Sequence, residues 1–180
     1  MAAQGAGYFP LTPTQGTYVI GLSNAIPALL AMLLIQVVGR RKILVFGYSS
    51  MAVFLFLCGL SVYQGWNLEA FITLCLFIGT FEFTQGSVAW LYIPEVTVDA
   101  ATGFTTGAQF INLMLITFTF EFMINSSLRI YGTIWYFAGM TFFGFLFCLC
   151  FVRETRGLTD LEKKTLYSPK SVMDEQIMEL

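Results

Sequence analysis

Apolar residues along the chain gather into five long runs, and each run is continuous rather than alternating with polar residues. A run of about 20 apolar residues is the length that a helix needs to cross a bilayer. Continuous runs favour helices over barrel strands, because barrel strands alternate and because lipid offers backbone groups no hydrogen-bond partners. We therefore predict five transmembrane helices, at Thr17–Val38, Ile43–Tyr63, Ala70–Ile93, Gly103–Ile124 and Thr133–Val152.

The polar segments between these runs are short, so consecutive helices must run antiparallel and the odd number puts the two termini on opposite sides. The predicted fold class is an all-α integral membrane helical bundle. Its expected parts are a polar N-terminal segment (1–16), a five-span transmembrane domain (17–152) and a polar C-terminal tail (153–180), with a short amphipathic helix expected after Gly157. Glycines inside the spans are expected at close helix contacts rather than in sites: Gly47, Gly59, Gly79, Gly107, Gly139 and Gly144.

Basic residues flank the predicted spans very unevenly. One side holds Arg40, Arg41 and Lys42 together with the five basic residues of the tail, whereas the other side holds only Arg129. By the positive-inside rule the C-terminus is predicted to face the cytoplasm, or the matrix if the membrane is mitochondrial. The favoured location is an organellar, mitochondrial inner membrane, and the plasma membrane or an endomembrane is the alternative.

Composition agrees with a membrane protein and limits the chemistry. Hydrophobic residues make up 57% of the chain, charged residues 11%, and the mean hydropathy is +0.73, whereas a soluble domain carries about 25% charged residues. The chain has no histidine, its four cysteines lie in apolar runs, and no phosphate-binding loop is present. We therefore predict no enzyme activity, no cofactor, no metal and no nucleic-acid partner. The expected partners are the lipid bilayer and other membrane proteins.

Three motifs point to a family. "VVGRRK" lies between the first two spans, "FEFTQGSVAWLYIPEV" ends the third, and "VRETRGLTDLE" follows the last. In their order and separation they resemble the C-terminal half of the sugar porters of the major facilitator superfamily. There the matching places read approximately D/E-R-x-G-R-R, F-F-E-x-G-x-x-P-x-x-W-x-x-x-x-E and P-E-T-K-G-x-x-x-x-E. The resemblance covers about residues 15–165 and implies the last five helices of that fold.

The resemblance also implies roles for seven residues. It puts Asn24, Glu82 and Trp90 at sugar-facing positions, and it assigns a cytoplasmic charge cluster to Arg40, Arg41, Glu95 and Glu154. Without the resemblance the basic residues are simply a positive-inside flank. A charge at membrane depth is costly, and for Glu82 we favour a carboxylate that is protonated or bonded to a neighbouring helix or partner, with a vestigial sugar ligand as the alternative.

Several departures from the family pattern bear on function. Gln36 and Val37 stand where D/E-R is expected, Ser87 and Ala89 replace prolines, and the helices that would precede Asn24 are absent. Because such transporters rock two halves around a midplane site, five helices cannot complete the cycle. We therefore expect a non-transporting accessory subunit of a larger membrane complex, for example a mitochondrial respiratory-type assembly.

The alternative is a fragment or split half of a sugar transporter, with Met1 either a genuine start or a truncation of the gene model. Under either hypothesis we expect other subunits to cover the face that carries Glu82. A bound phospholipid is a further expected partner there.

Overall fold

The computed structural model of the protein describes residues 12–167, with the side chain of Gln36 excepted, and these residues are helical almost throughout. Within residues 12–167, five stretches are long and apolar enough to cross a membrane, which confirms the all-α bundle. The expected termini beyond 12 and 167 lie outside the described residues. The helices are α1 (Pro13–Val38), α2 (Arg40–Gln64), α3 (Asn67–Phe81), the π-helix η1 (Glu82–Ala89), α4 (Trp90–Val96), α5 (Asp99–Ile124), α6 (Arg129–Phe151) and α7 (Asp160–Thr165).

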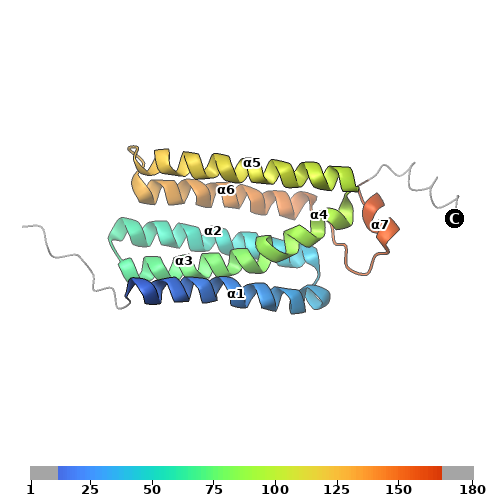
Figure 1. The fold of residues 1–180 in the computed structure, drawn as a ribbon, viewed down its shortest axis with the longest axis horizontal. Helices are drawn as coiled ribbons and strands as arrows, with labels where there is room; N and C mark the ends of the chain where they lie inside the picture. Colours follow the sequence, from blue (N-terminus) through green and yellow to red (C-terminus); the bar gives the residue numbers. More distant parts are fainter. Residues whose placement is uncertain (1–11, 168–180) are drawn as a thin grey trace, which may run out of the picture.

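The helices lie alongside one another in two groups (Figure 1), with α5 and α6 forming one pair and α1, α2 and α3 the other group. Helix α2 joins the groups, because it packs extensively against both α6 and α3. Helix α1 packs on α3 and η1, whereas α5 contacts mainly α6 and the end of α4. We call the end where α1 meets α2 the Gly39 end, and the opposite end, where α2 meets α3, the Gly65 end.

Local sequence chemistry explains where several helices begin and end. Helix α1 starts with a capping box, in which the Thr12 N–H donates to Gln15 Oε1 at 2.9 Å and the Thr12 hydroxyl accepts from the Gln15 N–H, so backbone donors with no partner inside the helix are satisfied. Helix α2 ends at Gly65, whose φ of +77° lies in the left-handed region that glycine adopts without strain. A second capping box starts α7, where hydrogen bonds from the Thr159 N–H and hydroxyl lower the pKa of Glu162.

The buried core lies near the Gly39 end. Ile35, Ile43, Leu44, Val88 and Tyr92 form its centre, brought together from α1, α2, η1 and α4. By contrast, neither α3 nor α5 has any fully buried residue. In lipid this exposure is expected for apolar side chains, and it is greatest in the middle of α5, where every residue from 110 to 122 is exposed.

Small residues set the closest helix contacts, as packing in lipid requires. A Cβ added at Gly47 would lie 1.9 Å from Cγ2 of Thr84 on η1, and one at Gly59 would lie 2.5 Å from the Trp135 ring. Close contacts are therefore confirmed at these two positions, and also at Gly79 and Gly144. The expectation is wrong at Gly107 and Gly139, where nothing lies within 4 Å, because α5 and the outer face of α6 are open.

The Gly47–Thr84 contact allows a direct test of the packing. We expect Gly47→Ala to lower the free energy of unfolding by about 1–3 kcal/mol, the usual cost of overpacking a close contact. Thermal unfolding of the purified protein in detergent measures the change. The matched control is Gly139→Ala, which adds the same methyl group in open space on another spanning helix; equal losses in both variants would contradict the packing described here.

Candidate functional site

The third span is interrupted by a π-helix, which the sequence pattern did not predict. The segment from Glu82 to Ala89 has the wider turn, and the Ser87 hydroxyl donates to the Glu82 carbonyl, five residues earlier, at 2.9 Å. A Cβ added at Gly86 would lie 2.4 Å from Glu82 Oε2, so only glycine leaves room for the carboxylate in this position. Single π segments inside α-helices occur frequently at functional sites.

Glu82 is paired across two spans. The Asn24 side chain, on α1, donates through Nδ2 to Glu82 Oε1 at 3.0 Å. No Lys or Arg among residues 12–167 forms an ion pair with Glu82. A carboxylate has about four acceptor positions, and the single side-chain bond from Asn24 leaves most of them free for another donor. The structure thus joins two of the three predicted sugar-facing residues, which lie 58 positions apart in sequence.

Trp90 is the third of these residues and stands at the first position of α4. Its side chain is 40% exposed, and within the described part of the chain its indole N–H donates no hydrogen bond. The open face of the ring is therefore free to contact another molecule.

A second polar contact supports the π segment from the opposite side. The Tyr48 hydroxyl, on α2, donates to Gln85 Oε1, and the Tyr48 ring lies where a Cβ on Gly144 would approach it to 3.0 Å. Sequence reasoning missed this contact, because both residues are single polar groups inside apolar runs with no motif around them. It holds η1 against α2 and so fixes the position from which Glu82 projects.

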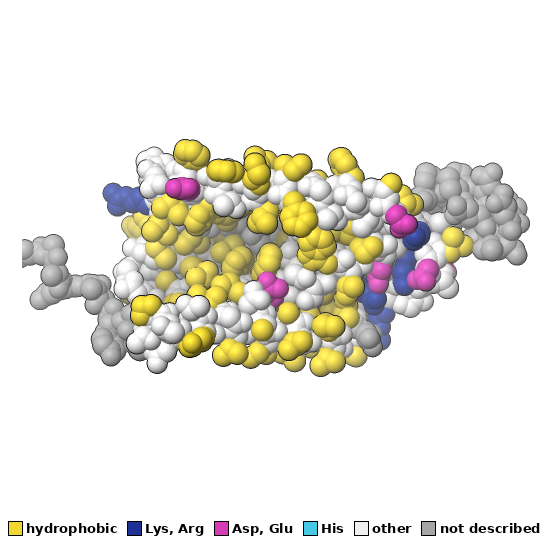
Figure 2. Space-filling model, in the orientation of Figure 1, with side chains coloured by type: hydrophobic (Ala, Val, Ile, Leu, Met, Phe, Trp, Pro, Cys, Tyr) yellow, Lys and Arg dark blue, Asp and Glu magenta, His cyan; other side chains and the backbone are white. Residues whose placement is uncertain are grey.

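A hollowed face runs between α5 and the α1–α3 group (Figure 2), with acidic and basic side chains mostly at the two ends of the bundle. Two cavities lie beside α5. One of about 560 Å³ is lined almost wholly by apolar side chains of α2, α3, α5 and α6. The other, of about 490 Å³ and nearer the Gly39 end, includes the polar side chains of Tyr48, Gln85, Thr97 and Thr105. Helix α5 therefore borders open space on the side of these cavities, while it packs against α6 and the end of α4.

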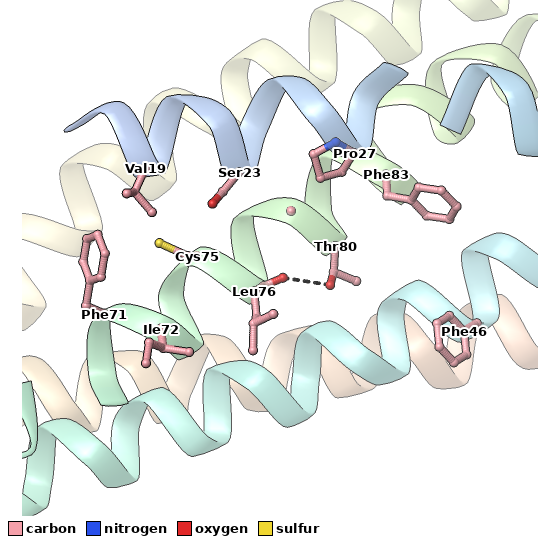
Figure 3. A pocket seen from close by; sticks show the side chains of 11 residues that line it. Val19, Ser23, Pro27, Phe46, Phe71, Ile72, Cys75, Leu76, Thr80 and Phe83 are labelled. Atoms are coloured by element: carbon pink, nitrogen blue, oxygen red, sulfur yellow. Dashed lines mark hydrogen bonds between the residues drawn. The ribbon is translucent and has the colours of Figure 1, made fainter. Parts of the chain in front are cut away.

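A further crevice of about 430 Å³ lies between α1 and α3 (Figure 3), with Val19, Pro27 and Leu76 among its walls. Among its few polar groups, the Thr80 hydroxyl donates to the Leu76 carbonyl at 2.8 Å. Most of the side chains that line the crevice are apolar, and none of them is charged.

The charge cluster forms at the Gly39 end. Arg40 Nη2 lies 2.7 Å from Glu95 Oε1, and each side chain is only 19% exposed. The Thr155 hydroxyl donates to the other oxygen, Glu95 Oε2, at 2.8 Å, and Thr155 itself is fully buried. The ion pair therefore joins the start of α2 to the end of α4, and Thr155, in the segment after α6, is a member of the cluster that the sequence did not indicate.

Glu154 acts on the backbone rather than on a guanidinium. Its Oε1 accepts the N–H groups of Arg40, Thr155 and Arg156 at 2.9, 3.1 and 3.1 Å. A carboxylate at the N-terminus of α2 is also favoured by the helix dipole. Gly39, with φ of +92°, is required at the turn, because a Cβ there would lie 2.7 Å from Glu154 Oε2.

Arg41 does not join the cluster. Its Nη2 donates to the Leu149 carbonyl near the end of α6 at 3.0 Å, and it makes no ion pair with Glu95 or Glu154 in the described chain. Arg156 instead reaches α1, where its Nη1 donates to the Val37 carbonyl. Both arginines thus satisfy carbonyl groups near helix C-termini.

A pair of tyrosines attaches α7 to the bundle. The hydroxyls of Tyr92, on α4, and Tyr167, just beyond α7, lie 2.6 Å apart. The Tyr92 hydroxyl donates to the Arg153 carbonyl at 2.9 Å, and the Arg153 guanidinium lies 5.4 Å from the centre of the Tyr167 ring. Nothing in the sequence motifs indicated this contact.

These features define a multi-pass membrane protein with a transporter-like helical arrangement. A family model described as "Sugar (and other) transporter" matches residues 6–167, and the chain belongs to this family. It is 31% identical to the probable metabolite transport protein CsbC of Bacillus subtilis, over 97% of this chain and 41% of that protein. It is 25% identical to the D-xylose-proton symporter of Escherichia coli, over 89% of this chain and 35% of that protein.

Solved structures agree with the fold. The chain matches the proton:xylose symporter XylE bound to 6-bromo-6-deoxy-D-glucose with a TM-score of 0.78 and 26% identity, over 84% of this chain and 34% of XylE. The inward open conformation of XylE from Escherichia coli gives the same TM-score at 25% identity. The chain thus spans about two fifths or less of the length of these relatives, and all of them are transporters by name rather than enzymes.

The charge cluster yields a test of what holds the Gly39 end together. We expect Glu154→Ala to lower the free energy of unfolding by about 1–3 kcal/mol, because it leaves the partly buried N–H groups of Arg40 and Thr155 without an acceptor. Glu154→Gln keeps one carbonyl oxygen and should lose less. Thermal unfolding in detergent measures both.

The control for this test is Glu69→Ala at the start of α3, whose side chain makes no hydrogen bond within the described residues. It removes a carboxylate near a helix N-terminus without unpairing a donor. If Glu154→Ala were no more damaging than Glu69→Ala, the capping role would be refuted.

Proposed function

We propose that the chain forms part of the sugar path of a sugar porter, with the pair of Asn24 and Glu82 as its polar centre. The observation that carries this proposal is the 3.0 Å contact between the two side chains on an open face of the bundle, in a chain that belongs to the sugar transporter family. Carboxylate and amide together offer acceptors and donors for sugar hydroxyls.

The pair of Asn24 and Glu82 suits a site that binds and releases sugar. Without sugar, the Asn24 amide partly relieves the cost of a carboxylate at membrane depth, which is at least about 2.5–3.5 kcal/mol on insertion scales. A sugar hydroxyl that donates to the free acceptor positions of Glu82 relieves more of this cost. Gly86 leaves room for the Glu82 carboxylate, and the contact from Tyr48 to Gln85 fixes the π segment against α2. Together they keep the carboxylate turned toward α1.

Trp90 is the proposed apolar wall of the site. An indole offers a flat apolar face that packs against the C–H groups of a sugar ring, with an N–H donor at its edge. Its partial exposure supports this role, and it lies on the same span as Glu82.

The open face of α5 supports a need for further transmembrane helices. No residue of α5 is fully buried, and the two cavities of about 560 and 490 Å³ lie along it. The proposed occupants are helices of the remaining part of the transporter, either on a longer chain or on a partner subunit. They would close the path and cover the face that carries Glu82.

The relatives favour transport over the main hypothesis drawn from the sequence. Their names describe transporters, and they give no support to a non-transporting accessory subunit or to a respiratory-type assembly. A mitochondrial inner membrane likewise has no support among them. The proposed charge cluster of Arg40, Glu95 and Glu154 fits a transporter as well, because it ties helix ends at one side of the membrane.

Sugar uptake by the intact assembly tests this function. We expect proteoliposomes that contain the native assembly, isolated through a tag on this chain, to take up D-xylose or D-glucose saturably. Glu82→Gln should weaken the apparent affinity about tenfold to a hundredfold, since it removes a charged acceptor worth about 1.5–3 kcal/mol. The purified chain alone should show no uptake above protein-free liposomes.

The matched control is Glu121→Gln, a carboxylate on the exposed α5, which should leave uptake unchanged. The proposal would be overturned if the assembly folds and reconstitutes but takes up neither sugar, and if it also shows no sugar binding that Glu82→Gln weakens. It would also restore the accessory-subunit hypothesis.

Orientation is the second proposal for the whole chain. The basic flank of Arg40, Arg41 and Lys42 supports placing the Gly39 end and the C-terminus in the cytoplasm, or the matrix in a mitochondrion. Protease protection of terminal tags in sealed membranes should show the two tags on opposite sides. Digestion of both tags from one side would contradict five spans.

A further inference from the structure

We propose that the outer face of the α2–α6 pair binds one anionic phospholipid, with its phosphate at Arg41 and Lys42 and an acyl chain in the groove between the helices. This binding site is separate from the proposed sugar path. It lies on the opposite side of the α2–α6 pair from α3 and α5.

The headgroup end is a shallow pocket of about 410 Å³ at the start of α2. Arg41 and Lys42 line it together with Phe46, Ser49 and Leu149. Lys42 is exposed and makes no hydrogen bond within residues 12–167, and Arg41 uses one of its five N–H groups on the Leu149 carbonyl. Donors with positive charge therefore remain available at the level where lipid phosphates lie.

The acyl end is a groove of about 650 Å³ that continues from the same residue, because Ser49 lines both spaces. Its walls are apolar and include Val53, Phe56, Trp135 and Phe142. Trp135 is held in place by its hydrogen bond from Nε1 to the Phe56 carbonyl at 3.2 Å. Gly139 leaves the floor open, since nothing lies within 4 Å of a Cβ built there.

The two faces of the α2–α6 pair are distinct. Leu55, Cys58 and Val62 of α2 line the cavity shared with α3 and α5, whereas Val53, Phe56 and Leu57 line the outer groove. The outer groove has no helix of this chain over it in the described structure. The proposed occupant is a lipid of the surrounding membrane, and the positive charges of Arg41 and Lys42 at the end of the groove favour an anionic headgroup.

An anionic lipid fits both parts of this surface. No acidic residue lines either the pocket or the groove, and each basic residue near a membrane surface favours an anionic lipid by about fivefold. Basic pockets between helices on the cytoplasmic side are a known way of holding acidic headgroups. A neutral lipid can place an acyl chain in the groove, but its headgroup lacks the favourable charge contacts with Arg41 and Lys42.

Native mass spectrometry of the purified protein tests the site, with phosphatidylglycerol and phosphatidylcholine of identical acyl chains as probes. We expect the wild-type protein to retain phosphatidylglycerol several times more than phosphatidylcholine. Lys42→Gln and Arg41→Gln should each lower the retention of phosphatidylglycerol about fivefold. Gly139→Leu, which fills the groove from a position with free space, should lower the retention of both lipids.

The control is Lys164→Gln, which removes an exposed positive charge on α7 and should change nothing. Equal retention of the two lipids by the wild type, or full retention of phosphatidylglycerol by Lys42→Gln, would overturn the proposal. Displacement of the lipid by soluble glycerol phosphate at similar concentration would overturn it too, since it would identify a phosphate site without a role for the groove. Thermal unfolding of each variant confirms that it is folded.

Discussion

A polar group inside a bilayer must find its partner within the protein, and this constraint governs the whole bundle. Glu82 is its clearest instance, because this carboxylate lies within a span of 30 residues and has the Asn24 amide as its partner. The π-helix, the contact from Tyr48 to Gln85 and the absence of a side chain at Gly86 all serve to hold Glu82 where that partner can reach it. The packing of α1 on η1 is therefore inseparable from the polar pair.

The same constraint acts differently at the two ends of the bundle. At the Gly39 end, Arg40, Glu95 and Glu154 join the ends of three spans through an ion pair and backbone hydrogen bonds. At the Gly65 end the contacts are aromatic, with the Tyr63 and Tyr131 rings 5.2 Å apart. The Gly39 end is thus tied by directional bonds between the ends of spans, an arrangement that suits a half that moves as one body.

The sequence predicted the five spans well, because apolar runs of membrane length are a direct physical signature. It also led to Glu82, because a carboxylate inside an apolar span is conspicuous, whereas Asn24 was found only through motif spacing. The π-helix was not predicted, because no motif marks it and the helices it packs against, α1 and α2, lie far away in sequence. The tie of Thr155 to Glu95 and the attachment of Arg41 to Leu149 were missed for the same reason. Glycine proved an unreliable indicator, since Gly107 and Gly139 face open space while Gly47 is tightly packed.

We propose that the face of α1 and η1 that carries Asn24 and Glu82 lines a path open to water and sugar in the assembled transporter. Labelling of single cysteines measures this most directly, in a cysteine-free version of the chain within its native assembly. Position 28 lies one helical turn beyond Asn24 on the same face, and position 53 lies on the outer face of α2.

We expect a membrane-impermeant thiosulfonate to modify Ala28→Cys, saturating sugar to slow this reaction, and Val53→Cys not to react. Failure of Ala28→Cys to react, with or without sugar, would show that this face is sealed from water and is no part of a sugar path.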